Sequence, residues 1–377
     1  MGLPSAKKQS VGGLTVIFRA RPSHFASAAA LALAFACCAC TGRPLQGVLI
    51  PAAQSATGVS RVPILVATTR QRSTTDPGDM FSANPGREIS YASIKVSIPP
   101  DGARKIGEIQ WPKSLPGDPA HDFVTASAEY LDKQSFSKAI SAEAKTSGRS
   151  RVLVFVHGFN NRFDEAVYRL AQIVQDSKAP AIPVLFSWPS KGVVRLAAYK
   201  DDVQAANDSR SAFKQLLSVI AANPSVKEIT VLCHSAGCWP GLEALGPRSI
   251  RFSSRGQVKN VLLVAPDVDV DVFRTEVQQT SKPRPRIALF ASRDDRALKM
   301  SASIWGKPRL GDATLDQTYW SEFEREGVLV FDLSNLQGNA HSRAFEDVTS
   351  VMGMIERRLA EGQQLSDGES LLSDATQ

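Results

Sequence analysis

The chain has 377 residues and an ordinary globular composition, with 43% hydrophobic and 21% charged residues, so it is long enough to bury a sizeable core in one large domain or two smaller ones. The formal net charge is +7, but the first 39 residues carry four basic residues and no acid, which leaves +3 for the remainder. This charge is small and scattered, without an arginine-rich tract or zinc-finger spacing, so the composition argues against a nucleic-acid partner.

The N-terminus has the features of an export signal. Basic residues precede an alanine-rich apolar run at 26–39, which is shorter than the about 20 residues that span a membrane. Small residues followed by cysteine resemble a bacterial lipoprotein signal, and we expect Cys40 to be lipidated, with Cys37 and Cys38 as alternatives. The expected location is the bacterial cell envelope, on a membrane anchor facing the periplasm. An ordinary cleaved signal peptide, an uncleaved anchor and a cytosolic protein are the other interpretations.

Composition divides the chain into four predicted segments. Residues 1–40 are the export signal, and residues 41–61, rich in Gly, Pro, Ser and Ala, form a tether. Residues 62–360 form the folded domain, and residues 361–377 form a disordered, polar and acidic tail.

The predicted elements of the domain change character along the chain. Runs at 62–70, 87–99 and 106–112 resemble β-strands. From residue 151, short apolar strands alternate with helices: strands at 151–159, 181–188, 227–233, 257–266, 285–292 and 327–334, and helices at 163–177, 200–222, from 237, and 342–362. Continuous apolar strands joined by helices predict an α/β fold, a mostly parallel central sheet with helices on both faces. Functional residues in such sheets lie at the carboxyl ends of the strands.

One serine stands at a predicted turn between strand and helix. In VLCHSAGCW the strand ends at Cys233 and the helix starts near Gly237, so Ser235 occupies the turn. The pattern is a variant of the G-x-S-x-G nucleophile elbow in which Cys233 replaces the first glycine. The N–H of Ala236, at the start of the helix, is suited to stabilise a developing oxyanion.

A serine nucleophile needs a histidine base and an acid that orients it, and in this fold they follow in the order Ser, acid, His. His341 is the one histidine after Ser235. The acid is expected after the penultimate strand, where Asp295 is preferred and Asp294 is the alternative. Some hydrolases place the acid one strand earlier, where this chain has Asp267, Asp269 and Asp271.

The second oxyanion donor is expected in the sequence HGFN, which follows the strand at 151–159. The N–H of Phe159 is assigned to this role, and Gly158 permits the close turn. The nearby His157 and His234 are expected to hold turns by hydrogen bonds. Each of these residues also has a purely structural interpretation, since a serine can cap a helix. Their joint occurrence at predicted strand ends favours catalysis.

Two cysteines flank Ser235. Cys233 ends a predicted strand and Cys238 lies on the following helix, so their side chains are expected to point apart. Both are interpreted as small buried fillers, with a disulfide as the less favoured alternative.

Segments from 62 to 358 also resemble a known family, the bacterial α/β-hydrolases of the esterase/lipase superfamily that carry a domain of unknown function. The resemblance rests on ILVATTRQR, VFVHGFNNRFDEAVYRLAQI, FSWPS, HSAGCW, LVAPDVDVDVF, SRDDRAL and HSRAF. It implies the α/β-hydrolase fold and an esterase-like triad, with Ser235, Asp295 and His341 at the matching positions. Many members have Met where this chain has Ala236. The resemblance supplies no substrate.

The sequence therefore predicts a serine hydrolase that cleaves carboxylic esters through an acyl-enzyme, without metal or organic cofactor. Four apolar residues after a predicted strand are candidates for the wall of an acyl pocket or, equally, for the core: Trp188, Val193, Val194 and Leu196. No long lid is evident, which favours small-molecule or lipid esters with short or medium acyl chains. The alternatives are an envelope-anchored binding or scaffold protein without turnover, and a peptidase, thioesterase or acyltransferase on the same fold.

Overall fold

The structure is a computed structural model that describes residues 46–245, 257–280, 284–315, 317–334, 339–342 and 345. The chain divides into two compact units, Met1–Cys40 and Thr41–Gln377, and all of the described residues belong to the second. The predicted export signal, Cys40 and the predicted acidic tail lie outside the described residues. No helix in the described ranges is long and apolar enough to cross a membrane.

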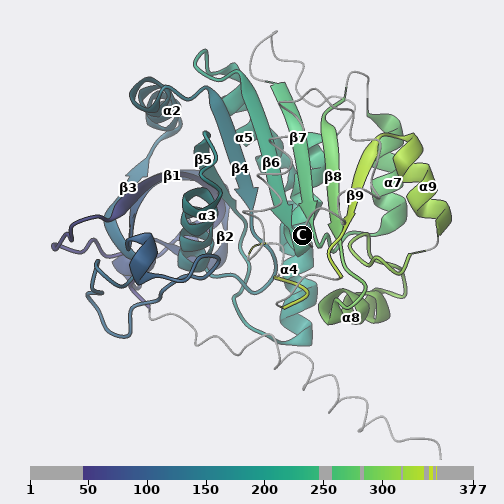
Figure 1. The fold of residues 1–377 in the computed structure, drawn as a ribbon, viewed down its shortest axis with the longest axis horizontal. Helices are drawn as coiled ribbons and strands as arrows, with labels where there is room; N and C mark the ends of the chain where they lie inside the picture. Colours follow the sequence, from purple (N-terminus) through teal and green to yellow (C-terminus); the bar gives the residue numbers. More distant parts are fainter. Residues whose placement is uncertain are drawn as a thin grey trace, which may run out of the picture. The chain divides into compact units, whose positions relative to one another are not determined.

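One nine-stranded sheet organises the described chain (Figure 1). Its strand order is β3-β2-β1-β5-β4-β6-β7-β8-β9, from one edge to the other. The pairs β1–β2 and β2–β3 are antiparallel, and every other neighbouring pair is parallel. The strands are β1 Ser60–Arg72, β2 Phe81–Ile98, β3 Val124–Leu131, β4 Arg151–Val156, β5 Ile182–Ser187, β6 Glu228–His234, β7 Gln257–Val264, β8 Arg286–Ala291 and β9 Val328–Asp332.

Helices cover both faces of this sheet, as the strand sequences require. The α-helices are α2 Lys133–Ser147, α3 Phe163–Ser177, α4 Leu196–Asp208, α5 Arg210–Ala222, α6 Cys238–Gly241, α7 Val270–Gln279, α8 Arg296–Trp305 and α9 Gln317–Arg325. Short 3-10 helices are η1 Pro77–Asp79, η2 Asp101–Ala103, η3 Ser235–Gly237 and η4 Leu242–Ala244. Alternate residues of β4 enter different cores: Val154 packs in a cluster with Phe213 of α5, whereas Phe155 packs in a cluster with Leu170 of α3. Burial on both faces explains the continuous apolar runs, and the predicted fold class is confirmed.

Several predicted boundaries were wrong. The segment 106–112 forms no strand; it is held on α3, where the Gly107 N–H donates to the Asp176 carboxylate at 2.8 Å. The third strand is β3, which lies later in the chain and pairs with β2. The predicted helix at 200–222 is two helices separated at Ser209. The Ser209 hydroxyl donates to the Ala205 carbonyl at 2.8 Å and lies 2.9 Å from the Thr69 hydroxyl of β1, so it fixes the break against the sheet.

The segment predicted as a tether is partly packed onto the domain. Val48 and Leu49 are buried in the same core cluster as α3. The Val48 carbonyl accepts hydrogen bonds from the hydroxyls of Thr125 and Tyr168, both at 3.0 Å. These contacts exclude a freely moving chain at these positions, so the folded domain includes residues before Val62. Most of the predicted last helix, 342–362, lies outside the described residues.

Candidate active site

The turn that carries Ser235 has the backbone geometry of a nucleophile elbow. Strand β6 ends at His234, and η3 and α6 follow without an intervening loop. Ser235 has a φ of 51°, in the left-handed region. A non-glycine residue there costs roughly 1–2 kcal/mol, and such conformations persist only where the surroundings hold them. The strained turn presents Ser235 at the carboxyl edge of the sheet.

Two glycines let the elbow approach the end of β4. A Cβ atom added to Gly237 would lie 2.1 Å from the His157 carbonyl oxygen, and one added to Gly158 would lie 3.0 Å from Cβ of Ser235. Any side chain at Gly237 would therefore push the elbow away from β4. The close contact places the HGFN loop directly beside the serine.

Ser235, His341 and Asp295 form one hydrogen-bonded chain. The Ser235 hydroxyl lies 3.1 Å from Nε2 of His341, and Nδ1 of His341 lies 2.8 Å from Oδ2 of Asp295. Since a carboxylate only accepts, Nδ1–H donates to Asp295 and Nε2 is left to accept from the hydroxyl. The structure thus brings together the three residues predicted as nucleophile, acid and base. Ser235 follows β6, Asp295 follows β8 and His341 follows β9.

The structure also distinguishes between the two candidate acids. Asp295 is 1% exposed and caps α8, with Oδ1 accepting from the N–H groups of Ala297 and Leu298 at 3.0 and 3.1 Å. Its other oxygen is thereby directed at His341. Asp294 instead accepts from the Ser292 hydroxyl at 2.6 Å. The Asp295 carboxylate is thus held by two N–H groups through one oxygen and hydrogen-bonded to His341 through the other.

The charges of this pair reinforce each other. Burial alone would lower the pKa of His341, but the Asp295 carboxylate outweighs it, so the pKa of His341 lies above its usual value. Burial alone would raise the pKa of Asp295, but the imidazolium and the hydrogen bonds that Asp295 accepts bring its pKa below the usual value. The arrangement would stabilise a positively charged His341.

His157 stands in a buried chain of hydrogen bonds that supports the HGFN loop. Nε of Arg70 donates to the Ser187 hydroxyl at 2.9 Å, and that hydroxyl lies 2.9 Å from Nε2 of His157. Nδ1 of His157 donates to the Gly158 carbonyl at 2.9 Å. Burial, with the nearby charge of Arg70, lowers the pKa of His157 to about 3, so the ring is neutral and Nε2 accepts from Ser187. The expected turn-holding role of His157 matches these contacts.

His234 links the elbow to the loop of the base. Its Nε2–H donates to the carbonyl oxygen of His341 at 3.0 Å, and the two rings lie 4.9 Å apart. Burial, then the charge of His341, lowers the pKa of His234 to about 3. A neutral His234 therefore holds the backbone of the residue that is hydrogen-bonded to Ser235.

The two expected oxyanion donors belong to the residue that follows Ser235 and to the HGFN loop after β4. Ala236 is the next residue and is fully buried in η3. Phe159 follows Gly158, at which an added Cβ atom would lie 3.0 Å from Cβ of Ser235, and the Phe159 ring packs edge-on against Tyr199 at 5.3 Å. In the part of the chain that the structure describes, no three His, Cys, Asp or Glu side chains gather in a group that could hold a metal ion.

A second buried carboxylate, Asp267, lies beside the elbow at the end of β7. Its N–H donates to the Ser235 carbonyl at 3.2 Å. Its side chain accepts from the hydroxyls of Tyr199, at 2.6 Å, and Ser301, and pairs with Arg309 at 3.5 Å. Asp269 caps α7 by accepting from the N–H of Asp271 at 2.9 Å. The sequence named these acids as alternatives but did not find Tyr199 or Ser301, which have no motif around them.

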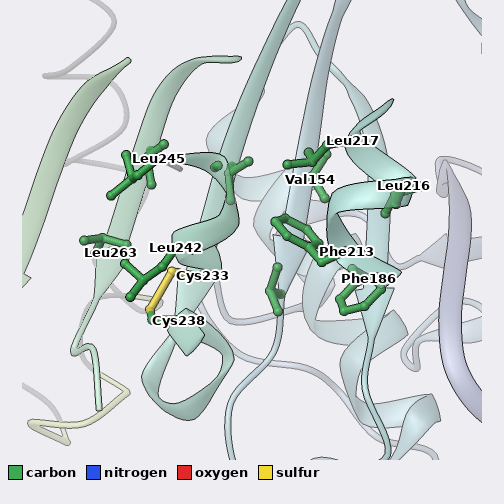
Figure 2. Close-up of a cluster of buried hydrophobic side chains, with 14 of the residues drawn as sticks. Val154, Phe186, Phe213, Leu216, Leu217, Cys233, Cys238, Leu242, Leu245 and Leu263 are labelled. Carbon is green, nitrogen blue, oxygen red and sulfur yellow. A yellow bond between two sulfur atoms is a disulfide. The ribbon is translucent and has the colours of Figure 1, made fainter. Parts of the chain in front are cut away.

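The cysteines on either side of the serine form a disulfide, so the expectation of two separate fillers was wrong. Cys233 and Cys238 are both fully buried, as expected, but their Cα atoms are only 5.0 Å apart and their sulfurs are bonded. The elbow reverses the chain within four residues, which brings the end of β6 and the start of α6 within the range of a disulfide. Figure 2 shows the bond among apolar side chains that include Leu242 and Leu263.

The candidates for an acyl pocket are only partly suitable. Trp188 is fully buried and its indole N–H donates to the His157 carbonyl at 2.8 Å, so it belongs to the core and not to a pocket wall. Val193 and Leu196 are each 40% exposed. A separate open cleft of about 1120 Å³ is lined by residues of β2, α4 and α5, but by none of the three triad residues. We therefore expect the substrate site beside Ser235 and not in this cleft.

Comparison with known proteins gives the family. The sequence profile of a family described as alpha/beta hydrolases of unknown function, DUF900, matches residues 132–358, more than half of the chain. The chain belongs to this family. The resemblance to α/β-hydrolases of unknown function and the predicted fold are thereby confirmed, and the family assigns no substrate.

Other comparisons add little to the DUF900 assignment. A solved structure of a protein of the alpha/beta hydrolase superfamily from Xanthomonas campestris pv. campestris is 16% identical and covers 55% of this chain and 99% of its own, with a TM-score of 0.28. Similarity at that level carries no argument about function. No curated protein matches the chain. The function of this DUF900 member must therefore be argued from its own residues.

Proposed function

We propose that this hydrolase-family protein is a serine hydrolase that cleaves carboxylic esters through an acyl-enzyme. The observation that carries the proposal is the chain Ser235–His341–Asp295, with contacts of 3.1 and 2.8 Å, built on an elbow whose serine has a φ of 51°. A serine in a left-handed turn, within reach of a histidine that a buried carboxylate orients, is the arrangement needed to activate a hydroxyl.

In the proposed mechanism, His341 takes the proton of Ser235 as its oxygen attacks the acyl carbon. Asp295 holds Nδ1–H of His341 and stabilises the imidazolium. The N–H groups of Phe159 and Ala236 stabilise the negative charge on the carbonyl oxygen, each donor contributing roughly 3–4 kcal/mol to lowering the barrier. His341 then protonates the departing alcohol, and a water molecule, activated by the same histidine, hydrolyses the acyl-enzyme.

The acyl group is proposed to lie against an apolar surface beside the HGFN loop. Tyr199 packs on Phe159 at 5.3 Å and on Trp305 at 6.5 Å, and its hydroxyl accepts from the Trp305 indole N–H at 3.1 Å. Trp305 is 41% exposed, and Leu196, also well exposed, lies one helical turn before Tyr199. An open apolar surface of this kind favours short or medium acyl chains from small-molecule or lipid esters.

The test is hydrolysis of p-nitrophenyl esters from acetate to laurate. Wild-type protein is expected to show burst kinetics with a preference for the shorter esters, and Ser235→Ala is expected to abolish turnover while remaining folded. Trp305→Ala is expected to raise KM for the longer esters in that range, and Ile106→Ala, another exposed apolar residue, serves as the matched control. Unchanged turnover in Ser235→Ala would overturn the proposed function.

Export is the second part of the proposal. The signal-like N-terminus and the lipidation candidate Cys40 support an envelope location, and the disulfide between Cys233 and Cys238 supports it independently, because such bonds persist mainly in oxidising compartments. Incorporation of radiolabelled palmitate into the full chain expressed in a Gram-negative host tests the anchor. Cys40→Ala is expected to lose the label, with Cys37→Ala and Cys38→Ala as the controls. Equal labelling in all three variants would contradict Cys40 as the lipidation site.

A further inference from the structure

The disulfide between Cys233 and Cys238 encloses the nucleophile. It joins the residue two before Ser235 to the residue three after it, with a separation of five positions in sequence. Between the two cysteines lie His234, Ser235, Ala236 and Gly237, so every residue of the elbow is inside the closed loop. Both cysteines are fully buried (Figure 2).

A disulfide that closes so short a loop is poorly suited to stabilise the whole domain. The stabilisation that a cross-link gives through the unfolded chain increases with the number of residues that it encloses. Here that number is close to the smallest possible, whereas the sheet is already held by two large buried clusters on its faces. The effect of the bond is therefore concentrated on the conformation of the enclosed residues.

The enclosed residues include the one that most needs restraint. Ser235 has a φ of 51°, which a non-glycine residue keeps only where neighbouring structure holds it. On one side, Gly237 is pressed against the His157 carbonyl, and the Asp267 N–H donates to the Ser235 carbonyl at 3.2 Å. On the other side, the sulfurs of Cys233 and Cys238 tie the end of β6 to the start of α6 within the apolar cluster.

We infer that the Cys233–Cys238 disulfide is a positioning element that holds Ser235 in its left-handed turn, so that the bond is required for fast acylation and not for the fold. The inference rests on the proposed function, because it assigns the bond to the activation of Ser235. Among the described residues, no hydrogen bond joins either sulfur to Ser235, His341 or Asp295, and we assign the effect of the two cysteines to the backbone of the elbow.

The test is the second-order rate constant for labelling Ser235 with a fluorophosphonate, measured on the full chain. Cys233→Ala, Cys238→Ala and the double variant are expected to react roughly 10- to 100-fold more slowly than wild type, because small displacements of a reacting atom reduce rates by such factors. Since each variant breaks the same bond, the two single variants and the double variant are expected to have nearly equal rates. If the two substitutions acted independently through packing, their rate reductions would instead multiply in the double variant.

Two readouts separate positioning from a loss of structure. The pH midpoint of labelling, which reports His341, is expected to stay at its wild-type value while the limiting rate falls. The control is Leu263→Ala, which removes a larger side chain from the same buried cluster and leaves the disulfide intact. It is expected to lower the melting temperature at least as much as the cysteine variants do, but to keep the labelling rate within about 3-fold of wild type.

Reduction of the wild-type chain covers the case in which the alanine variants do not fold. The two thiols of dithiothreitol pass two electrons and two protons to the bond, giving a cyclic disulfide and two cysteine thiols. The labelling rate is expected to fall with the appearance of alkylatable thiols and to recover when oxidised glutathione restores the bond.

Rates equal to wild type, in folded variants or in verified reduced protein, would overturn the inference while leaving the proposed function intact. Free thiols at both positions in protein purified without reductant would also overturn it. Failure of oxidised wild-type protein to label at Ser235 would overturn the proposed function itself, and with it this inference.

Discussion

Two buried aspartates at neighbouring strand ends have different surroundings. Asp295 follows β8 and is 1% exposed; Asp267 follows β7 and is 3% exposed. Asp295 faces one imidazole and two N–H groups, whereas Asp267 faces the hydroxyls of Tyr199 and Ser301 and the guanidinium of Arg309. Both positions can carry the acid of an α/β-hydrolase, and the sequence named both.

The role of each carboxylate is determined by the groups that it contacts and not by its position at a strand end. Asp295 is bonded to a group that changes charge during the proposed reaction, so its charge acts on the transition state. The side-chain partners of Asp267 keep their charge during the proposed reaction. Asp267 is therefore expected to hold the elbow in place, because its N–H donates to the Ser235 carbonyl.

The largest expected difference is in turnover. Asp295→Asn is expected to lower kcat by roughly 10⁴-fold, because the amide favours the wrong tautomer of His341. Asp267→Asn is expected to keep kcat within about tenfold of wild type, but to lower the free energy of unfolding by about 3–5 kcal/mol, because it leaves the buried Arg309 without a charged partner. Steady-state kinetics and urea melts measure both. Equal losses of kcat in the two variants would contradict the division of roles.

The buried histidines are expected to make the fold sensitive to acid. His157 and His234 have a pKa of about 3 in the folded protein, against an ordinary value of 6.5. The unfolded chain therefore binds more protons than the folded chain between these values. Their contribution to stability is complete above pH 6.5 and is lost as the pH falls towards 3.

The measurement is the free energy of unfolding at pH values from 7 to 4. Each histidine is expected to contribute a slope of up to about 1.4 kcal/mol per pH unit. His157→Gln should reduce the slope of the free energy of unfolding against pH by about the contribution of one histidine. A slope that does not respond to His157→Gln would contradict a neutral, buried His157.

The third expectation concerns the pH dependence of turnover. His341 must be neutral to accept the proton of Ser235, so kcat/KM is expected to fall about tenfold per pH unit below the pKa of His341. The pKa of His341 is raised, chiefly by Asp295 acting against burial and with a smaller contribution from Asp267, so the midpoint is expected above 6.5. Asp267→Asn should shift the midpoint slightly towards lower pH. A midpoint below 6.5 in wild-type protein would contradict the pairing of His341 with Asp295.

The smallest expected effect is that of removing one hydroxyl. Tyr199→Phe deletes the group that donates to Asp267 and accepts from Trp305, but keeps the ring against Phe159. Stability is expected to fall by roughly 1–3 kcal/mol, with kcat within a few-fold of wild type. Tyr91→Phe is the matched control, since this buried ring packs on Phe136 and no hydrogen bond to its hydroxyl occurs among the described residues. A loss of kcat as large as that of Asp295→Asn would show that the hydrogen-bonded group of Asp267, Tyr199 and Ser301 takes part in catalysis.

Much of the site could be anticipated because its residues lie at the ends of periodic elements. Apolar runs of the right length marked β6 and β8, and in a parallel sheet the carboxyl ends of such strands meet at one edge. This reasoning placed Ser235 and Asp295 near each other although 60 positions separate them. The order of the residues then left His341 as the one histidine available after the serine.

The sequence could not show what depends on side-chain direction. The pairing of Cys233 with Cys238 follows from the sharpness of the elbow, which brings their Cα atoms to 5.0 Å, and no local pattern encodes that distance. The choice of Asp295 over Asp294 depends on which side chain caps α8. The sequence left Trp188 open between pocket and core, because an apolar side chain at a strand end suits both equally well.

The central claim is that Ser235 is an activated nucleophile, and the most direct test is the site of fluorophosphonate attachment. The folded chain is incubated with the probe, digested and mapped by mass spectrometry, beside His341→Ala and the conservative variant Asp295→Glu. The account predicts a single adduct on Ser235, absent from His341→Ala and formed more slowly in Asp295→Glu. No adduct on folded wild-type protein, or an equal adduct in His341→Ala, would contradict it.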